Sequence, residues 1–269
     1  MRVDALQQRV SAIPRGAADY TTNLYADREE LERWSQSAPL QVETATEGTV
    51  LLLRADRGFN RVYHVAQSSA ALSSALTMLP PGYYVTDLIG KVDPLNKVCV
   101  AYAEAGFARH AFLRRMTCTD HAYVIDGANS RSVAELAHPD AALDVAEFLD
   151  RLLDPYTDQP PSVAELTNAA RDGRLLVVSR GGELAGILMY DRTAQAAHLR
   201  FWHVAPAAQG GGVGRALMVG FLARCMHVRR IVLWVVGDNE RTLAIYRHYG
   251  FATDGLLDYI MTLRKDREA

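Results

Sequence analysis

Four glycines stand close together late in the chain, in the stretch Gln209-Gly-Gly-Gly-Val-Gly214. Each glycine costs backbone entropy on folding, so a cluster of four needs a reason. The stretch lies between an expected strand and an expected helix, which places free backbone N–H groups at a helix N-terminus. Such an end favours an anion, typically a phosphate, because of its unpaired donors and the helix dipole. We therefore expect a phosphate-binding loop; the alternative is a glycine-rich turn without a ligand.

Two familiar phosphate loops fit this stretch poorly. A Walker A loop ends in Gly-Lys-Ser/Thr, whereas this loop ends in Gly-Arg-Ala. A dinucleotide-binding fold opens with G-x-G-x-x-G in the first of several βαβ units, with an acidic residue about 20 positions later. Here the loop comes late in the chain, and the strands around it read as hairpins.

The elements that must position the loop follow from the hydrophobic pattern and the stop signals. In the second half we expect helices over 140–156, 162–173, 215–226 and 238–250, and strands over 174–191 (a hairpin), 196–206, 230–236 and 251–265, with a short strand near 121–128. In the first half we expect helices over 27–36, 69–79 and 95–106, and strands over 49–56, 61–67, 80–90 and 107–117.

The two halves of the chain look like copies of one another. Both contain His-Val-Ala at a strand end, at His64 and at His203, and both then continue to a helix. Both place an Asn before a later helix that ends in Tyr-x-x-x-Gly-Phe, at 102–107 and at 246–251. The first copy has Gln-Ser-Ser-Ala-Ala-Leu where the second has the glycines, so we place ligand binding in the second copy.

Length and composition set the limits. A chain of 269 residues suits two domains of ordinary size, and the formal net charge of −2 argues against a dedicated nucleic-acid binder. We find no apolar run of the roughly 18 residues that span a bilayer, and no secretory signal, so we expect a cytoplasmic protein without membrane contact. Cys99, Cys118 and Cys225 are far apart and predict neither disulfides nor a metal site.

Val-x-Pro followed by Gln-x-x-Gly-x-Gly resembles the acyl-CoA pyrophosphate loop of the GNAT N-acetyltransferase superfamily. The downstream stretch NERTLAIYRHYGF is similar to the family's second signature, with Asn239, Tyr246, Gly250 and Phe251 at the matching positions. The resemblance covers roughly residues 140–262 and, in degenerate form, 45–117.

The resemblance implies an α/β (α+β) protein with two GNAT-like domains, each a mixed, mostly antiparallel sheet flanked by helices. We assign residues 1–119 to a degenerate domain and 120–269 to the domain that binds acyl-CoA and catalyses transfer. It also implies direct transfer of an acetyl or other short acyl group from coenzyme A to the amine of a small molecule or amino acid. Acetyl-CoA is the expected co-substrate, and no metal is expected.

Site residues follow from the same resemblance. The pyrophosphate would bind the loop, the pantetheine arm would run along Trp202–Val204, and the backbone N–H of Val204 would face the thioester oxygen. Tyr246 would be the general acid that protonates the leaving thiolate, unless it is a core aromatic that shares a helix face with Leu243. The residues expected to bind the cofactor are Trp202, His203, Val204, Gln209, Gly210, Gly211, Gly212, Val213, Gly214, Arg215, Asn239 and Tyr246. Asn239 has an equally good alternative as a plain N-cap.

The general base is where the chain departs from the family pattern. Such enzymes often carry a carboxylate on the strand before the loop, and His198–Val204 contains none. Alternation along this strand predicts Leu199, Phe201 and His203 on one face. His203 is our candidate catalytic base because imidazole titrates near neutral pH, and a structural histidine is the alternative. His64 holds the matching place in the first copy, which favours the structural reading.

Three other functions remain open at this point. The chain could hold acyl-CoA without transferring it, it could take its acyl group from an acyl carrier protein, or it could acylate a protein lysine. We expect a small-molecule amine as the acceptor, no nucleic-acid partner, and a monomer or homodimer.

Overall fold

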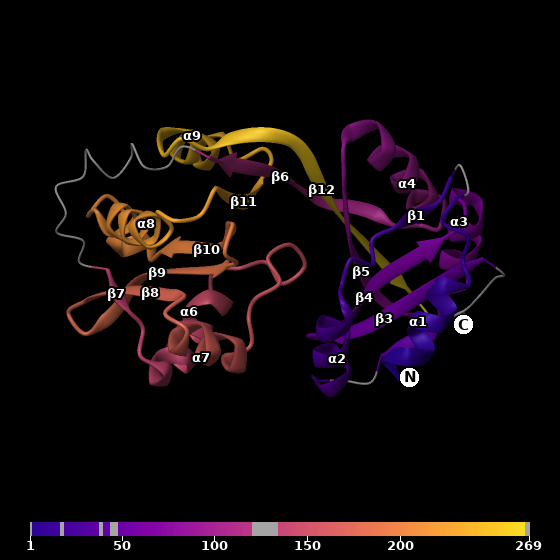
Figure 1. Cartoon of the computed structure of the whole chain (residues 1–269), viewed down its shortest axis with the longest axis horizontal. Coiled ribbons are helices and arrows are strands. Elements are labelled where there is room, and N and C mark those ends of the chain that lie inside the picture. Colours follow the sequence, from indigo (N-terminus) through magenta and orange to yellow (C-terminus); the bar gives the residue numbers. More distant parts are fainter. Residues whose placement is uncertain (1, 17–18, 38–39, 44–47, 120–133, 267–269) are drawn as a thin grey trace. The chain divides into compact units, whose positions relative to one another are not determined.

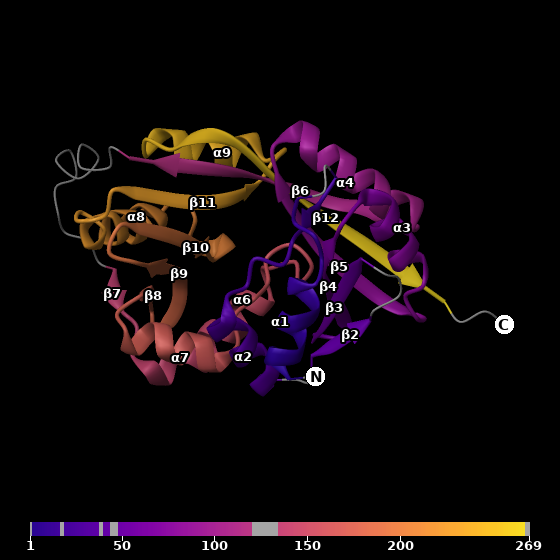
Figure 2. The same ribbon diagram turned by 45° about the vertical axis from the view of Figure 1, so that its right-hand side comes forward.

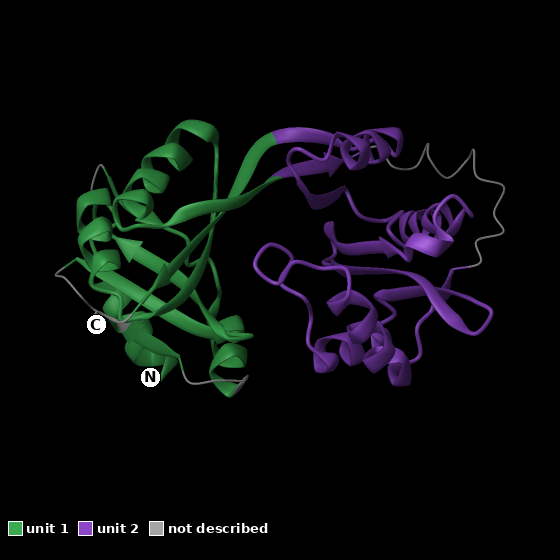
Figure 3. Ribbon diagram, turned by 180° about the vertical axis from the view of Figure 1, so that it is seen from behind, with its two compact units in different colours: residues 1–113, 255–269 green, residues 114–254 purple. Residues whose placement is uncertain are grey.

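The computed structural model describes the chain apart from residues 1, 17–18, 38–39, 44–47, 120–133 and 267–269 (Figure 1). The chain forms two compact units (Figure 3): unit 1 is Met1–Leu113 with Gly255–Ala269, and unit 2 is Arg114–Asp254. The C-terminal segment, which we expected in the second domain, therefore groups with unit 1. The strand expected near 121–128 lies outside the described residues.

Unit 1 is built on a mostly antiparallel sheet in the order β2-β3-β4-β5-β12. The β4–β5 pair is parallel, whereas β2–β3, β3–β4 and β5–β12 are antiparallel. Its elements are α1 (Val3–Ser11), β1 (Thr21–Thr22), α2 (Arg28–Ser37), β2 (Gln41–Glu43), β3 (Thr49–Asp56), β4 (Phe59–Ala66), α3 (Ser69–Thr77), β5 (Gly82–Gly90) and α4 (Val92–Glu104). The strands β6 (Ala108–Cys118) and β12 (Ala252–Lys265) each contribute residues to both units.

Two cores cover the two faces of this sheet. One joins α3 and α4 to residues such as Leu51, Val62 and Leu88, and the other joins α1 and α2 to Val50 and Leu52. Consecutive residues of β3 thus belong to different cores, as expected for a strand that is buried on both faces.

Unit 2 repeats this plan. Strands β7 (Glu135–Leu136), β8 (Leu175–Arg180), β9 (Glu183–Arg192) and β10 (Ala196–Val204) pair antiparallel, and β11 (Arg230–Val236) pairs parallel with β10. The helical elements are η1 (Pro139–Ala141), α6 (Ala142–Asp150), α7 (Val163–Arg171), η2 (Pro206–Ala208), α8 (Val213–Arg224) and α9 (Glu240–His248). The predicted fold class, a mixed and mainly antiparallel sheet flanked by helices, is confirmed in both units.

Helices α8 and α9 cover one face of the unit 2 sheet, and α6 and α7 cover the other (Figure 2). Leu176 and Leu188 pack with α8, whereas their neighbours Leu175 and Ile187 pack with α6 and α7. Helix α7 begins with a capping box, in which the Ser162 Oγ accepts from the Glu165 N–H at 3.2 Å and the Ser162 N–H donates to the Glu165 carboxylate at 2.9 Å.

Candidate functional site

Strands β10 and β11 begin as partners and then separate. Their parallel pairing runs from Ala196↔Arg230 to Leu199↔Leu233, and β10 then continues to Val204 with β9 as its partner. The Ala205 N–H donates to the Ala185 carbonyl at 2.9 Å, so the main-chain groups of Ala205 face β9. Because these groups alternate between the edges of an antiparallel strand, those of Trp202 and Val204 face the edge that β11 has left. Among the described residues, the strand predicted to receive a pantetheine arm therefore ends in an open edge.

A β-bulge interrupts β10 between Leu199 and Phe201. The extra residue changes the face on which the following side chains lie. Leu199 packs in the core under α8, whereas Phe201 packs in the core under α6 and α7. The predicted common face of Leu199, Phe201 and His203 is therefore wrong, because Leu199 lies opposite Phe201.

The glycine loop leads from the end of β10 into α8, as predicted. Gly210 and Gly212 have positive φ angles of 75° and 82°, a conformation that other residues adopt at a cost. Gly212 is the N-cap of α8, and the first helical bond runs from the Ala216 N–H to the Gly212 carbonyl at 3.0 Å. The N–H groups of the first helical turn therefore have no acceptor within the helix.

The start of α8 lies close against the open strand edge. A Cβ on Gly214 would lie 3.3 Å from the Trp202 ring and 3.5 Å from the Val204 side chain. On the neighbouring strand, a Cβ on Gly186 would lie 2.9 Å from the His203 carbonyl oxygen. Glycine thus lets the first turn of α8 pack closely on the side chains at the end of β10.

Arg180 is a cation at the loop that our sequence reasoning missed. It ends β8, and its guanidinium Nη2 donates to the Gly211 carbonyl. Arg215, the predicted loop cation, is exposed in the first turn of α8. The predicted hairpin turn at Gly181-Gly182 was the available signal for Arg180, but only the strand order places this turn beside the loop.

Tyr246 lies on α9 with its ring centroid 5.5 Å from that of Trp202 and 5.8 Å from that of Phe251. The residue is buried, and burial raises the pKa of its hydroxyl, which is therefore protonated at neutral pH. Trp202 also carries an indole Nε1 that is buried and has no hydrogen-bond partner among the described residues. The predicted acid is thus packed against the open edge of β10.

Asn239 and His203 are placed differently from Tyr246. The Asn239 carboxamide oxygen accepts from the Thr242 N–H at 3.1 Å, which is the N-cap alternative. His203 lies 6.5 Å from Phe201 between ring centroids, and alternation places it on the face opposite Trp202. Burial lowers the pKa of His203 to about 4, so its imidazole is neutral at pH 7 and is a weak base.

The loop between α6 and α7 uses its acidic side chains internally. The Asp154 carboxylate accepts from the Tyr156 N–H at 3.1 Å and from the Thr157 hydroxyl at 2.8 Å. The Asp158 carboxylate accepts from the Asp154 N–H at 2.9 Å, and burial raises the pKa of Asp158. These carboxylates stabilise the loop that joins α6 to α7.

Over the described part of the chain, no group of three or more His, Cys, Asp or Glu side chains is arranged to hold a metal ion. No described helix has the length and apolar character needed to cross a membrane.

The region that contains this site matches a known protein family. Residues 143–251 match the acetyltransferase (GNAT) family. Mycothiol acetyltransferase of Beutenbergia cavernae is 33% identical over 134 residues, which are 49% of this chain and 41% of that protein. Mycothiol acetyltransferase of Amycolatopsis mediterranei is 50% identical over 50 residues, 18% of this chain and 17% of that protein. The alignments thus span less than half the length of these relatives.

The fold of the whole chain also has a solved counterpart. A tandem GNAT protein from the clavulanic acid biosynthesis pathway superposes with a TM-score of 0.56 at 16% identity. The superposition covers 82% of this chain and 80% of that one, so the likeness of fold extends over both units.

Proposed function

We propose that this protein transfers an acetyl or other short acyl group from coenzyme A to an amine. The proposal follows from the match of residues 143–251 to the acetyltransferase (GNAT) family. The observation that carries the proposal is the junction in unit 2 where three features meet. The edge of β10 opens at Trp202, the N-terminus of α8 begins at Gly212, and the ring of Tyr246 packs on Trp202.

The residues at this junction fit an acyl-CoA. Free N–H groups at the start of α8 suit its pyrophosphate, and Arg180 and Arg215 add positive charge beside them. The outward N–H groups of Trp202 and Val204 suit the amide groups of the pantetheine arm and the thioester oxygen. The unpartnered indole Nε1 of Trp202 is a further donor on this side of the strand.

Transfer then requires two proton movements. The amine nitrogen attacks the thioester carbon, the C–S bond breaks, and Tyr246 donates its hydroxyl proton to the departing thiolate. The raised pKa of Tyr246 keeps this proton in place at neutral pH. The proton released by the amine goes to water or to His203, whose neutral imidazole has an acceptor nitrogen.

The acceptor is proposed as the amine of a small molecule or amino acid. The relatives matched above are named mycothiol acetyltransferases, a name that refers to mycothiol and to no protein acceptor. The loop carboxylates Asp154 and Asp158 bond within their own loop. We therefore do not assign them to a cationic acceptor.

One observation favours a second candidate, a unit that holds acyl-CoA without turning it over. The only ionisable side chain between Leu199 and Val204 besides Arg200 is His203, and burial makes it a weak base. Such a protein would bind acetyl-CoA and show no amine-dependent release of thiol.

The test is a thiol-release assay with acetyl-CoA and a panel of small amines. Tyr246→Phe should lower kcat by about 100-fold or more, the loss that accompanies removal of a general acid, with little change in acetyl-CoA affinity. Tyr249→Phe is the matched control, because its ring also packs on Trp202, 5.8 Å between centroids, on the same turn. Equal activity of wild type and Tyr246→Phe would overturn the assignment of the acid.

A further inference from the structure

Unit 1 contains the same separation of parallel strands as unit 2. Its strands β4 and β5 pair only at Asn60↔Tyr84 and Arg61↔Val85, and β4 then continues to Ala66. Strand β3 pairs with the other edge of β4 as far as Thr49↔Ala66. The edge of β4 beyond Arg61 on the β5 side therefore corresponds to the open edge of β10.

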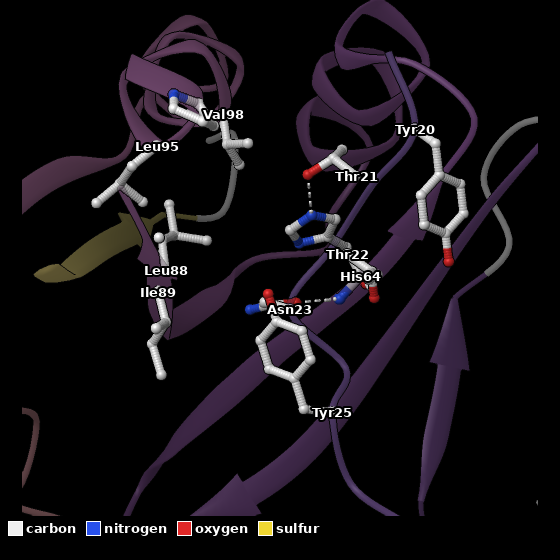
Figure 4. Close-up of a pocket in the computed structure, with 12 residues that line it drawn as sticks. Tyr20, Thr21, Thr22, Asn23, Tyr25, His64, Leu88, Ile89, Leu95 and Val98 are labelled. Atoms are coloured by element: carbon white, nitrogen blue, oxygen red, sulfur yellow. Dashed lines mark hydrogen bonds between the residues drawn. The ribbon is translucent and has the colours of Figure 1, made fainter. Parts of the chain in front are cut away.

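The chain itself fills this edge. The short strand β1 pairs antiparallel with β4 at Thr21↔Ala66 and Thr22↔Val65. Because β3 already pairs with the same two residues of β4, β1 must lie along the opposite edge. Figure 4 shows Thr21, Thr22 and Asn23 passing directly beside His64.

Asn23 lies between β4 and β5 and is hydrogen-bonded to both strands, and we call this residue the wedge. Its N–H donates to the His64 carbonyl at 3.2 Å, and its Oδ1 accepts from the His64 N–H at 2.6 Å. On its other side, Nδ2 lies 2.9 Å from the Thr86 hydroxyl and 3.0 Å from the Asp87 carbonyl. One buried side chain thus satisfies β4 and β5 at the point where they part.

The hydrogen bonds also fix which residues of the two units correspond. The Gln67 N–H donates to the Gly48 carbonyl, directly before β3, as the Ala205 N–H donates to the Ala185 carbonyl of β9, at 2.9 Å in each case. Gln67 therefore corresponds to Ala205. One residue earlier, Ala66 corresponds to Val204, and three residues earlier, His64 corresponds to Trp202. The sequence match of His64 with His203 is therefore wrong by one residue, because the bulge in β10 adds a residue that β4 lacks.

The tyrosine of unit 1 that corresponds to Tyr246 is also engaged by a side chain of its own unit. Tyr102, the counterpart of Tyr246, has its hydroxyl 2.9 Å from Nδ1 of His64. Burial lowers the pKa of His64 to about 3, so this is a contact between two neutral groups. The hydroxyl that corresponds to the proposed proton donor of unit 2 is therefore engaged in a hydrogen bond in unit 1.

The helix N-terminus of unit 1 is closed too. Ser68 caps α3, and its Oγ accepts from the Ala71 N–H at 3.2 Å. The corresponding cap of α8 is Gly212, which has no side chain. What remains beside β1 is a pocket of about 250 Å³, and Lys, Arg, Asp and Glu are all missing from its described lining.

We propose that Thr21–Asn23 takes, in unit 1, the place that the pantetheine arm of acyl-CoA takes in unit 2, so that each chain binds a single acyl-CoA. The reference to pantetheine rests on the proposed function of unit 2. The closure of unit 1 rests on the hydrogen bonds above and is tested separately.

The experiment is hydrogen exchange of the full chain, read at the amides of His64 and Ala66 and at those of Trp202 and Val204. Without ligand, the unit 1 amides should exchange at least about tenfold more slowly than the unit 2 amides. Saturating acetyl-CoA should slow only the unit 2 amides, and calorimetry should give one acetyl-CoA per chain. Asn23→Ala, which removes the Oδ1 that accepts from the His64 N–H, should speed exchange at His64.

Equal exchange of the two pairs without ligand, or slowing of the His64 amide by acetyl-CoA, would overturn the closure of unit 1. A ratio of two acetyl-CoA per chain would overturn it as well. If the unit 1 amides are protected but no acetyl-CoA binds at all, the closure stands and the proposed function of unit 2 fails.

Discussion

Unit 1 and unit 2 share a parallel strand pair that separates partway, and they treat the resulting gap in opposite ways. Unit 1 closes it with its own chain, a buried asparagine and a serine cap. Unit 2 leaves the strand edge open and places a glycine where the cap would be. The difference teaches that this fold creates a gap of unpaired main-chain groups, which must be satisfied by the chain, by water or by a ligand.

The largest effect should come from removing one donor of the open edge. Val204→Pro deletes the outward N–H and leaves the pairing of Ala205 with β9 in place, since proline is tolerated on a free strand edge. We expect kcat to fall by about 100- to 1,000-fold, the loss measured when an oxyanion donor is removed. Val204→Thr keeps the N–H and the branched shape and should retain most of the activity. Unchanged turnover of Val204→Pro would remove the open edge from the mechanism.

Breaking the wedge of unit 1 should cost stability and leave the chemistry of unit 2 alone. Asn23→Ala removes the partners of the His64 N–H and of the Thr86 hydroxyl, so we expect the free energy of unfolding to fall by about 1–3 kcal/mol. Denaturant unfolding measures this loss. Asn96→Ala, at an exposed position of α4, is the control and should change stability by less than about 0.5 kcal/mol. A wild-type midpoint for Asn23→Ala would contradict the role of the wedge.

Removing the hairpin cation should weaken cofactor binding and spare the chemical step. Arg180→Gln should raise the KM for acetyl-CoA by about tenfold, the loss of one contact to a charged group, with kcat nearly unchanged. The effect should shrink at high salt because the site is exposed. Arg224→Gln, near the far end of α8, is the matched charge control. A drop in kcat at constant KM would show that Arg180 positions the loop and does not bind phosphate.

The smallest expected effect is on how the stability of unit 1 depends on pH. Burial raises the pKa of Asp258 well above its ordinary value, and the nearby charge of Asp87 adds to the rise despite Arg61. The folded state therefore binds the proton more tightly than the unfolded state, and stability is lost as pH rises from the ordinary aspartate pKa through the raised one. Asp258→Asn should flatten this part of the stability profile, measured by denaturant unfolding between pH 4 and pH 9. If the stability of Asp258→Asn fell with rising pH as steeply as that of wild type, the assignment of this pH dependence to Asp258 would be contradicted.

Much of the fold could be predicted from sequence because its signals are local. The capping pattern at Ser162, Gly250 after α9 and the apolar run of β3 each depend on neighbouring residues, and the structure shows all three elements. The glycine loop and Tyr246 were found for the same reason, since each lies in a contiguous motif. Their roles as ligand site and acid remain predictions.

The rest could not be predicted because it depends on pairing between distant segments. The bulge in β10 has no marker between Leu199 and Phe201, yet it shifts His203 out of register with His64. Arg180 contacts the glycine loop only because of the order of the strands in the sheet. Thr21–Asn23 contacts β4, which lies some 40 residues further along the chain. The C-terminal strand joins unit 1 by pairing with β5, which no local pattern announces.

The central claim is that the open gap of unit 2 is an acyl-CoA site, and titration calorimetry with acetyl-CoA tests it most directly. Wild type should bind one acetyl-CoA per chain. Gly212→Glu should bind none, because its carboxylate would lie at the helix end and repel the pyrophosphate. A circular dichroism spectrum and melting midpoint close to wild type would show that the variant folds. Equal binding by wild type and a folded Gly212→Glu, or no binding of any acyl-CoA by wild type, would contradict the account.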